Sequence, residues 1–339
     1  MNSSTIPVPK FFNPEKVAQF WRVPYQERAK QAEQWAEKYQ LKPAAKDEVK
    51  TCLLLIDVQN TFCLPEFELF VGGQSGRGAV EDNVRLCEFI YGNLGKISKI
   101  IPTLDTHTTM QIFHPIFWVN ESGQHPTPAA TIITPEDVEK GLWRVNPAVA
   151  HEVMYGNYSA LQEYAYYYVS QLTQRGKYPL TIWPYHSMLG GIGHSLVSAV
   201  EEAIFFHSIA RQSQTRYELK GDNPLTENYS VLQPEVMENE KGDAIATKNT
   251  ALIAALLEFD QVFIAGQAKS HCVAWTIEDL LTSIQEKDPS LAQKVYLLED
   301  CTSPVVVPGV VDYTPQADEA FARFAQAGMQ VVNTKMEIL

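Results

Sequence analysis

The chain of 339 residues lacks the features that mark several large classes of protein. Its five cysteines are scattered without a Cys-x-x-Cys pair, which argues against a disulfide framework and a cysteine-rich zinc site. The net charge is −13 and no basic stripe is present, so we expect no nucleic-acid partner. No apolar run approaches membrane-spanning length, and the first residues show no signal-peptide pattern. These absences predict a cytoplasmic globular protein with no membrane partner.

What the chain does contain, from Cys52 onward, is a series of apolar strand-like runs that alternate with helical patterns. Buried strands separated by helices are typical of a parallel sheet that is covered on both faces. We expect strands at 52–57, 99–105, 179–183, 216–220, 261–265, 294–299 and 329–333, and helices near 80–94, 194–212, 247–258, 273–284 and 316–327. Ligands of such sheets bind beyond the carboxyl ends of the strands, so chemistry is expected there.

Two regions fall outside this alternation. Residues 1–50 predict an N-terminal helical extension ahead of a main domain at 51–339. Residues 115–178 form a long insertion that holds the aromatic stretch 164–168. The insertion fits a lid, a contact between copies of the chain or an ordered surface excursion. Because aromatic residues favour interfaces, we expect a homo-oligomer.

Cys272 follows the apolar run 262–265 and a glycine, and it precedes a segment with helical spacing of apolar residues. This pattern places the cysteine where a buried strand turns into a helix. Free N–H groups and the helix dipole favour a thiolate at such a place. Cys272 is therefore a candidate nucleophile; the alternative is a small apolar residue at the start of a packed helix.

Charged residues at the ends of two other predicted strands are candidates for the same site. Asp57 ends the first strand, where a buried carboxylate needs a partner, and it fits either a general base or a cap of the next turn. Lys220 ends the strand at 216–220 and fits either a cation of the same site or a surface lysine. A carboxylate, an ammonium and a thiol can together activate a nucleophile.

Histidines accompany two further strand ends. Asp105 and His107 lie two residues apart, which places both side chains on the same side of an extended segment. His186 follows the predicted strand at 179–183, and His114 lies seven residues after His107. Nitrogen and oxygen donors of this kind suit a divalent cation such as Zn, Fe or Mn, so we expect a metal site.

Taken together, these residues resemble the isochorismatase-like cysteine hydrolases, in particular the nicotinamidase branch. The matching segments occur in the family's order over most of the chain: Leu55–Phe62, Asp105–His107, Trp183–His186, Lys220–Asp222 with Tyr229–Ser230, and Gly266–Val273. The resemblance implies a doubly wound three-layer α/β sandwich with a mainly parallel central sheet.

The resemblance also implies roles for particular residues. It implies a catalytic triad of Asp57, Lys220 and Cys272, a cis peptide just before Ala268, and an oxyanion hole formed by the N–H groups of Ala268 and Cys272. It further implies a metal held by Asp105, His107 and His186, with His114 as an additional candidate ligand. Phe62 and Trp118 are our candidates for the walls of the substrate pocket.

The function predicted on this basis is cleavage of a small, nicotinamide-like carboxamide through a thioester acyl-enzyme. Two alternatives remain open. The first is another hydrolase of the same fold, either a carbamoyl- or biuret-type amidase or an isochorismatase. The second is a non-catalytic, metal-stabilised scaffold whose insertion binds a partner.

Overall fold

A computed structural model describes residues 6–336 and 338 of the chain. The chain forms two compact units, each built from separate stretches of sequence. The first unit contains the stretches up to Leu104, Ser195–Glu218 and Thr250 onward, and the second contains Asp105–His194 and Leu219–Asn249. Within the described residues, no helix combines the length and the apolar character that crossing a membrane requires.

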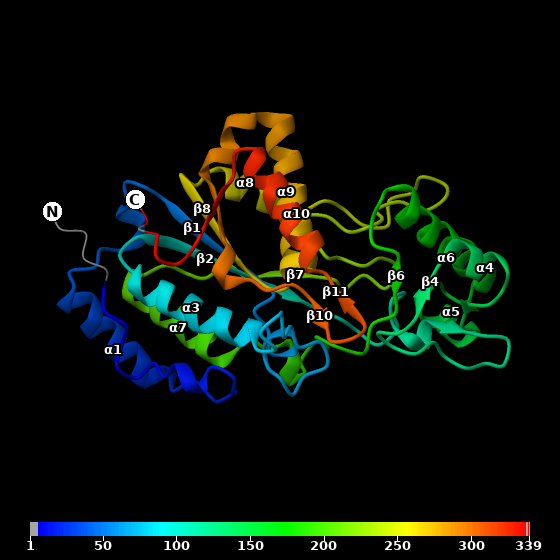
Figure 1. The fold of residues 1–339 in the computed structure, drawn as a ribbon, viewed down its shortest axis with the longest axis horizontal. Helices are drawn as coiled ribbons and strands as arrows, with labels where there is room; N and C mark the ends of the chain where they lie inside the picture. Colours follow the sequence, from blue (N-terminus) through cyan, green and yellow to red (C-terminus); the bar gives the residue numbers. More distant parts are fainter. Residues whose placement is uncertain (1–5, 337, 339) are drawn as a thin grey trace. The chain divides into compact units, whose positions relative to one another are not determined.

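Most of a six-stranded sheet with the order β12-β9-β8-β1-β2-β7 lies in the first unit, whereas Asp105, which ends β2, and Leu219–Lys220, which end β7, belong to the second (Figure 1). The strands are β1 (Thr51–Ile56), β2 (Ile97–Asp105), β7 (Glu218–Lys220), β8 (Gln261–Gly266), β9 (Val295–Leu298) and β12 (Gln330–Val332). β1 pairs in parallel with β2 and β8, and β9 pairs in parallel with β8 and β12. Every residue of β1 and β8 is buried, as expected for apolar strands covered on both faces.

Helices cover both faces of this sheet (Figure 1). α3 (Gly78–Gly92) and α7 (Ser198–Arg211) lie on one face, and α8 (Thr250–Leu257), α9 (Ala274–Lys287) and α10 (Thr314–Gln326) lie on the other. Leu53 and Leu55 of β1 share one core cluster with residues of α3 and α7, as the alternation of a strand requires. The predicted doubly wound, three-layer α/β fold is therefore confirmed.

The predicted N-terminal extension contains one long helix, α1 (Tyr25–Lys38), which begins directly after Pro24. α1 packs on α7, and Arg28 donates a charged hydrogen bond of 2.7 Å to Glu202 there. The short helix α2 (Asn60–Cys63) follows the first strand. A hairpin of β10 (Val306–Val307) and β11 (Val311–Asp312) precedes α10.

The second unit has a hydrophobic core of its own, which includes Phe113, Trp118, Tyr164 and Tyr168. Its helices are α4 (Pro135–Glu139), α5 (Pro147–Val153) and α6 (Tyr158–Gln174). Two short antiparallel pairs join β3 (Trp118–Val119) to β5 (Arg144–Val145) and β4 (Ile132–Ile133) to β6 (Leu180–Thr181). The insertion predicted at 115–178 thus contains most of the secondary structure of this unit.

One predicted strand of the central sheet is wrong. The run at 179–183 forms only the two-residue strand β6, which pairs with β4 and is not part of the six-stranded sheet. Pro179 begins this run and Pro184 follows it, and proline has no N–H to donate to a neighbouring strand. The apolar pattern therefore identified an extended segment correctly but assigned it to the wrong sheet.

Candidate active site

The ends of β1 and β8 are held in close contact within the first unit. Ile56 pairs with Gly266, and Gly266 has a φ of +120°. A Cβ atom at this position would lie 2.0 Å from the carbonyl oxygen of Ile56, so only glycine fits. Asp57 directly follows Ile56, and the Gln267–Cys272 segment directly follows Gly266. Both therefore begin at a pair of hydrogen-bonded neighbouring strands.

Asp57 is fully buried and is held by Thr103 of β2. The Thr103 hydroxyl donates to Asp57 Oδ1 over 2.5 Å and accepts from the Asp57 backbone N–H over 3.0 Å. Asp57 itself has a positive φ of 47°, which is uncommon for a non-glycine residue. The carboxylate at the end of the first strand is thus fixed in orientation by a neighbouring side chain.

Cys272 lies in a π-helical turn, Lys269–Val273, that leads directly into α9. The Ala268 carbonyl accepts hydrogen bonds from the N–H groups of His271 (3.0 Å) and Val273 (3.1 Å). The Gln267–Ala268 peptide bond is cis, which confirms the prediction from the resemblance. The predicted place of Cys272, between a buried strand and a helix, is also confirmed.

The other four cysteines are buried more completely than Cys272, with at most 1% of the residue exposed against 8% for Cys272. Burial raises the pKa of the Cys52, Cys63, Cys87 and Cys301 thiols well above the ordinary value. A thiol in such surroundings is a poor nucleophile because the thiolate is disfavoured. By its position before α9, Cys272 remains the candidate nucleophile.

In the second unit, Asp105, His107 and His186 come together as a buried cluster whose ligand atoms all lie within 4.8 Å of one another. Asp105 Oδ2 lies 2.8 Å from His107 Nε2 and 3.5 Å from His186 Nε2. The structure thus brings together the three residues that the sequence proposed as metal ligands.

The donor atoms of this cluster fit a divalent cation. His107 Nδ1 donates to the Gly221 carbonyl over 2.9 Å, and His186 Nδ1 donates to the Pro184 carbonyl over 2.7 Å. A carbonyl can only accept, so each Nδ1 carries a proton, and each Nε2 faces the Asp105 carboxylate, where a bound cation would take its lone pair. Backbone contacts of this kind orient histidines for metal binding. Two nitrogen lone pairs and a carboxylate oxygen form a suitable ligand set.

Gly221 leaves the space in which this cluster forms. Its φ is +86°, and a Cβ atom there would lie 2.8 Å from His107 Cε1 and 2.9 Å from Asp105 Oδ1. Gln111 donates to the same Gly221 carbonyl over 2.6 Å. The turn after Lys220 is therefore shaped by the ligand residues packed against it.

Lys220 is buried in the second unit, where its ammonium donates to Asp105 Oδ1 (2.7 Å) and to the Asn228 carbonyl (2.8 Å). Burial alone would raise the pKa of Asp105, but His107 and Lys220 outweigh it and hold this pKa well below the ordinary value. Lys220 thus keeps a candidate metal ligand ionised. Its predicted role beside Asp57 and Cys272 stays a prediction.

His114 lies beside the cluster but is not one of its three members. Its ring centroid is 5.9 Å from that of His107 and 6.0 Å from that of His186, and its Nδ1 donates to Thr109. Burial, followed by the charges of His186 and His107, lowers the pKa of His114 to about 3, so it is neutral near neutral pH. Among the described residues, its Nε2 has no hydrogen-bond partner.

The two predicted pocket walls have different surroundings. Phe62 is nearly buried in α2, within the core of the first unit. Trp118 is fully buried in the core of the second unit, and its indole N–H donates to the Ile112 carbonyl over 2.6 Å. This is the environment of a core side chain.

Sequence reasoning missed several residues that hold the candidate site. Thr103 could have been found from the sequence, because it places a hydroxyl group inside an apolar strand, close to the end of that strand. Gln111, which lies between Met110 and Ile112, and Asp82, which accepts a hydrogen bond from the Gln267 side chain, gave no such signal. Their contacts depend on which loops fold back against them.

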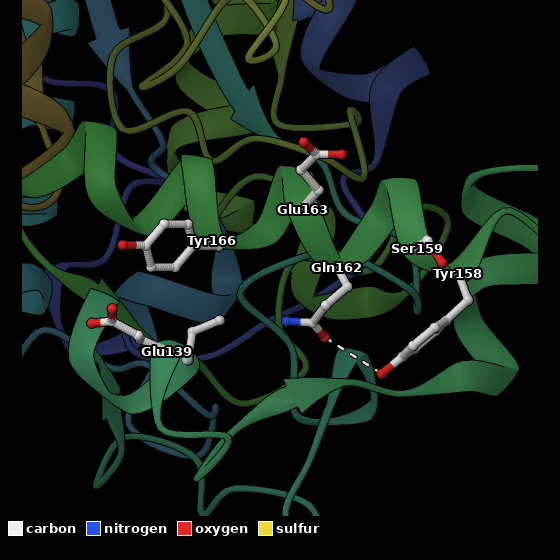
Figure 2. A pocket seen from close by; sticks show the side chains of 7 residues that line it. Glu139, Tyr158, Ser159, Gln162, Glu163 and Tyr166 are labelled. Atoms are coloured by element: carbon white, nitrogen blue, oxygen red, sulfur yellow. Dashed lines mark hydrogen bonds between the residues drawn. The ribbon is translucent and has the colours of Figure 1, made fainter.

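An open depression of about 530 Å³ also occurs in the second unit, on α4 and α6 (Figure 2). It is lined by Val138, Glu139, Tyr158, Ser159, Gln162, Glu163 and Tyr166. None of the candidate catalytic or metal-binding residues lines it, so it is distinct from the candidate site.

The fold and the strand-end residues define a class of doubly wound α/β proteins. No protein-family model matches the chain, and comparison with curated proteins finds no significant match. Among solved structures, the chain is similar to a nicotinamidase and pyrazinamidase from Acinetobacter baumanii, with a TM-score of 0.50 and 17% identity over 86% of this chain and 99% of that one. It is also similar to the yeast nicotinamidase Pnc1p bound to the inhibitor nicotinaldehyde, with a TM-score of 0.51 and 14% identity over 84% of this chain and 99% of that one. At these identities the likeness shows a shared fold, the fold that the resemblance predicted.

Proposed function

We propose that the chain is a cysteine amidohydrolase that cleaves a small carboxamide of the nicotinamide type. One observation carries the proposal: the register that pairs Ile56 with Gly266. This register places Asp57 directly after β1 and, beside it, places the turn that contains the cis peptide and Cys272 directly after β8. A carboxylate and a thiol at adjacent carboxyl ends of a parallel sheet suit nucleophilic catalysis. The fold shared with two nicotinamidases supports this proposal.

In the proposed reaction, Asp57 takes the proton of the Cys272 thiol, and the thiolate attacks the amide carbonyl to form a C–S bond. The N–H groups of Ala268 and Cys272 donate to the resulting oxyanion. Asp57 returns the proton to the leaving nitrogen, the C–N bond breaks, and ammonia departs from a thioester. Water then attacks the thioester, which releases the carboxylic acid and restores the thiol. On the resemblance alone, Lys220 is the cation that balances the charge of Asp57.

Asp105, His107 and His186 would hold a divalent metal in the proposed enzyme. A bound cation of this kind acts as a Lewis acid that orients an electron-rich atom of the substrate, such as a ring nitrogen. The contribution of the chain itself is to fix the ligands: carbonyl contacts hold both imidazoles in the required tautomer, and Lys220 keeps Asp105 ionised.

The test is ammonia release from a panel of carboxamides headed by nicotinamide. We compare the wild type with Cys272→Ala, with metal-stripped protein, and with Cys301→Ala as a matched control that also deletes a buried thiol. The proposal expects release that requires Cys272 and the metal but not Cys301. Ammonia release only from carbamoyl- or biuret-type amides would mean that the enzyme acts on a different class of substrate. If metal-loaded protein released ammonia from none of the amides, the non-catalytic scaffold would be favoured.

A further inference from the structure

Gln267 connects the end of β8 to the proposed oxyanion hole, and its side chain is buried. The backbone N–H donates to the Ile56 carbonyl over 2.8 Å. The side-chain Nε2 donates to Asp82 Oδ2 over 2.8 Å, and Oε1 accepts from the Ser303 N–H over 3.2 Å. A buried amide with a partner at each end can hold only one orientation. The residue directly before Ala268 is therefore clamped on both sides.

Ser303 holds the other flank of Ala268. Its carbonyl accepts from the Lys269 N–H over 2.8 Å, so one residue contacts both neighbours of Ala268. Gly78, at the start of α3, allows this loop to approach the helix, because a Cβ atom at Gly78 would lie 2.5 Å from Ser303 Oγ. Gln267 and Lys269, the two neighbours of Ala268, are thus both hydrogen-bonded to Ser303.

Asp82 of α3 is the charged end of this chain of contacts. It is almost fully buried, and its Oδ1 accepts a charged hydrogen bond of 2.8 Å from Arg85. Burial raises the pKa of Asp82 to about 6, against hydrogen bonds from Ser303, Gln267 and Arg85 that favour the carboxylate. Near pH 8, about two units above this value, Asp82 is ionised and accepts from all three neighbours.

We propose that Asp82 is a positioning residue for the oxyanion hole: through Gln267 and Ser303 it fixes the peptide that presents the Ala268 N–H. This inference rests on the proposed function for its catalytic meaning, but the clamp itself is a property of the fold. Displacing a donor by a fraction of an ångström weakens transition-state stabilisation without changing the nucleophile.

The variants are Asp82→Asn and Gln267→Met, which break the same contact from opposite sides. An asparagine cannot accept from both Gln267 and Arg85, because one of its two terminal atoms is a donor. Methionine fills the space of glutamine without hydrogen bonds. Glu81→Gln is the matched control, since it removes a charge from the adjacent, half-buried position of α3, where Glu81 accepts a hydrogen bond from Ser75.

Three quantities are measured near pH 8: amide hydrogen exchange of residues 266–273, kcat/KM for ammonia release, and the alkylation rate of Cys272 by iodoacetamide. Alkylation reports the thiolate but requires no oxyanion hole. In both variants we expect exchange at 266–273 to accelerate at least ~10-fold and kcat/KM to fall at least ~10-fold. Alkylation should stay within about twofold of wild type, and Glu81→Gln should match wild type throughout.

Unchanged exchange at 266–273 in both variants would overturn the inference. Acceleration spread equally over β9 and α10 would also overturn it, because it would mean general destabilisation. If the wild type hydrolyses no carboxamide, the proposed function fails, and the exchange measurement still decides whether Asp82 holds this segment.

Discussion

At the scale of single residues, the candidate site depends on small groups placed between larger ones. The Thr103 hydroxyl both donates to and accepts from Asp57, and Gly221 leaves room for His107 and Asp105. Neither residue contributes chemistry of its own in the proposed reaction. Each decides whether a reactive side chain is held in the orientation that the reaction requires.

Thr103→Val tests the support of Asp57. Valine has nearly the shape of threonine, but it leaves the buried Asp57 N–H and carboxylate without the hydroxyl between them. We expect a loss of about 1–3 kcal/mol in the free energy of unfolding and a fall in kcat/KM of at least ~10-fold. Urea unfolding and steady-state kinetics measure both. Thr103→Ser keeps the hydroxyl and should lie close to wild type; equal behaviour of the two variants would refute the role of the hydroxyl.

Gly221→Ala tests the metal cluster. The added methyl group meets His107 and Asp105 at less than 3 Å, so the ligands must move apart. We expect the affinity for Zn²⁺, measured by competition with a chelator, to fall at least ~10-fold. Gly242→Ala is the control, because Gly242 has a similar φ of +81° with nothing within 4 Å of a Cβ atom. Equal losses in both variants would mean that backbone strain, not the ligand geometry, sets the affinity.

At the scale of secondary-structure elements, sequence periodicity predicted most of the structure. The apolar runs at β1 and β8 and the helical spacing after Cys272 gave both strands and α9 at nearly their observed bounds. The pattern failed at 179–183, because a short apolar run between two prolines does not reveal its pairing partner. The clamp of Gln267 by Asp82 was also invisible, since it joins residues 185 positions apart.

The helix α6 has aromatic residues both on its buried face and on its exposed face. Tyr164 and Tyr168, four positions apart, are buried in the core of the second unit, whereas Tyr166 is 42% exposed. The Tyr164 hydroxyl donates to the Leu225 carbonyl over 2.8 Å. The aromatic stretch of the predicted insertion is thus partly a core, and its role in self-association stays a prediction.

Tyr164→Phe tests this division. Removing the hydroxyl leaves the Leu225 carbonyl without its donor, so we expect a loss of about 1 kcal/mol in the free energy of unfolding, measured by urea titration. Tyr166→Phe removes the same atom from the exposed face and should change stability little. A larger loss at Tyr166 than at Tyr164 would contradict the placement of α6.

At the scale of the whole molecule, the chain adds a second unit, with its own core, to a doubly wound sheet. The sequence predicted the sheet and an insertion, but it did not show that 105–114, 179–194 and 219–249 join the insertion in one unit. Contacts among separated stretches determine such a unit, and the periodicity of one segment carries no information about them. The candidate residues were found because strand ends can be recognised locally.

The proposed function depends on acylation of Cys272 by a carboxamide. The most direct measurement is mass spectrometry of the protein after acid quenching during turnover of nicotinamide or the best amide of the panel. We expect an adduct with the mass of the acyl group on the peptide that contains Cys272, absent from Cys272→Ala and lost as the substrate is consumed. Ammonia release at the wild-type rate by Cys272→Ala, or an adduct on another residue, would contradict it.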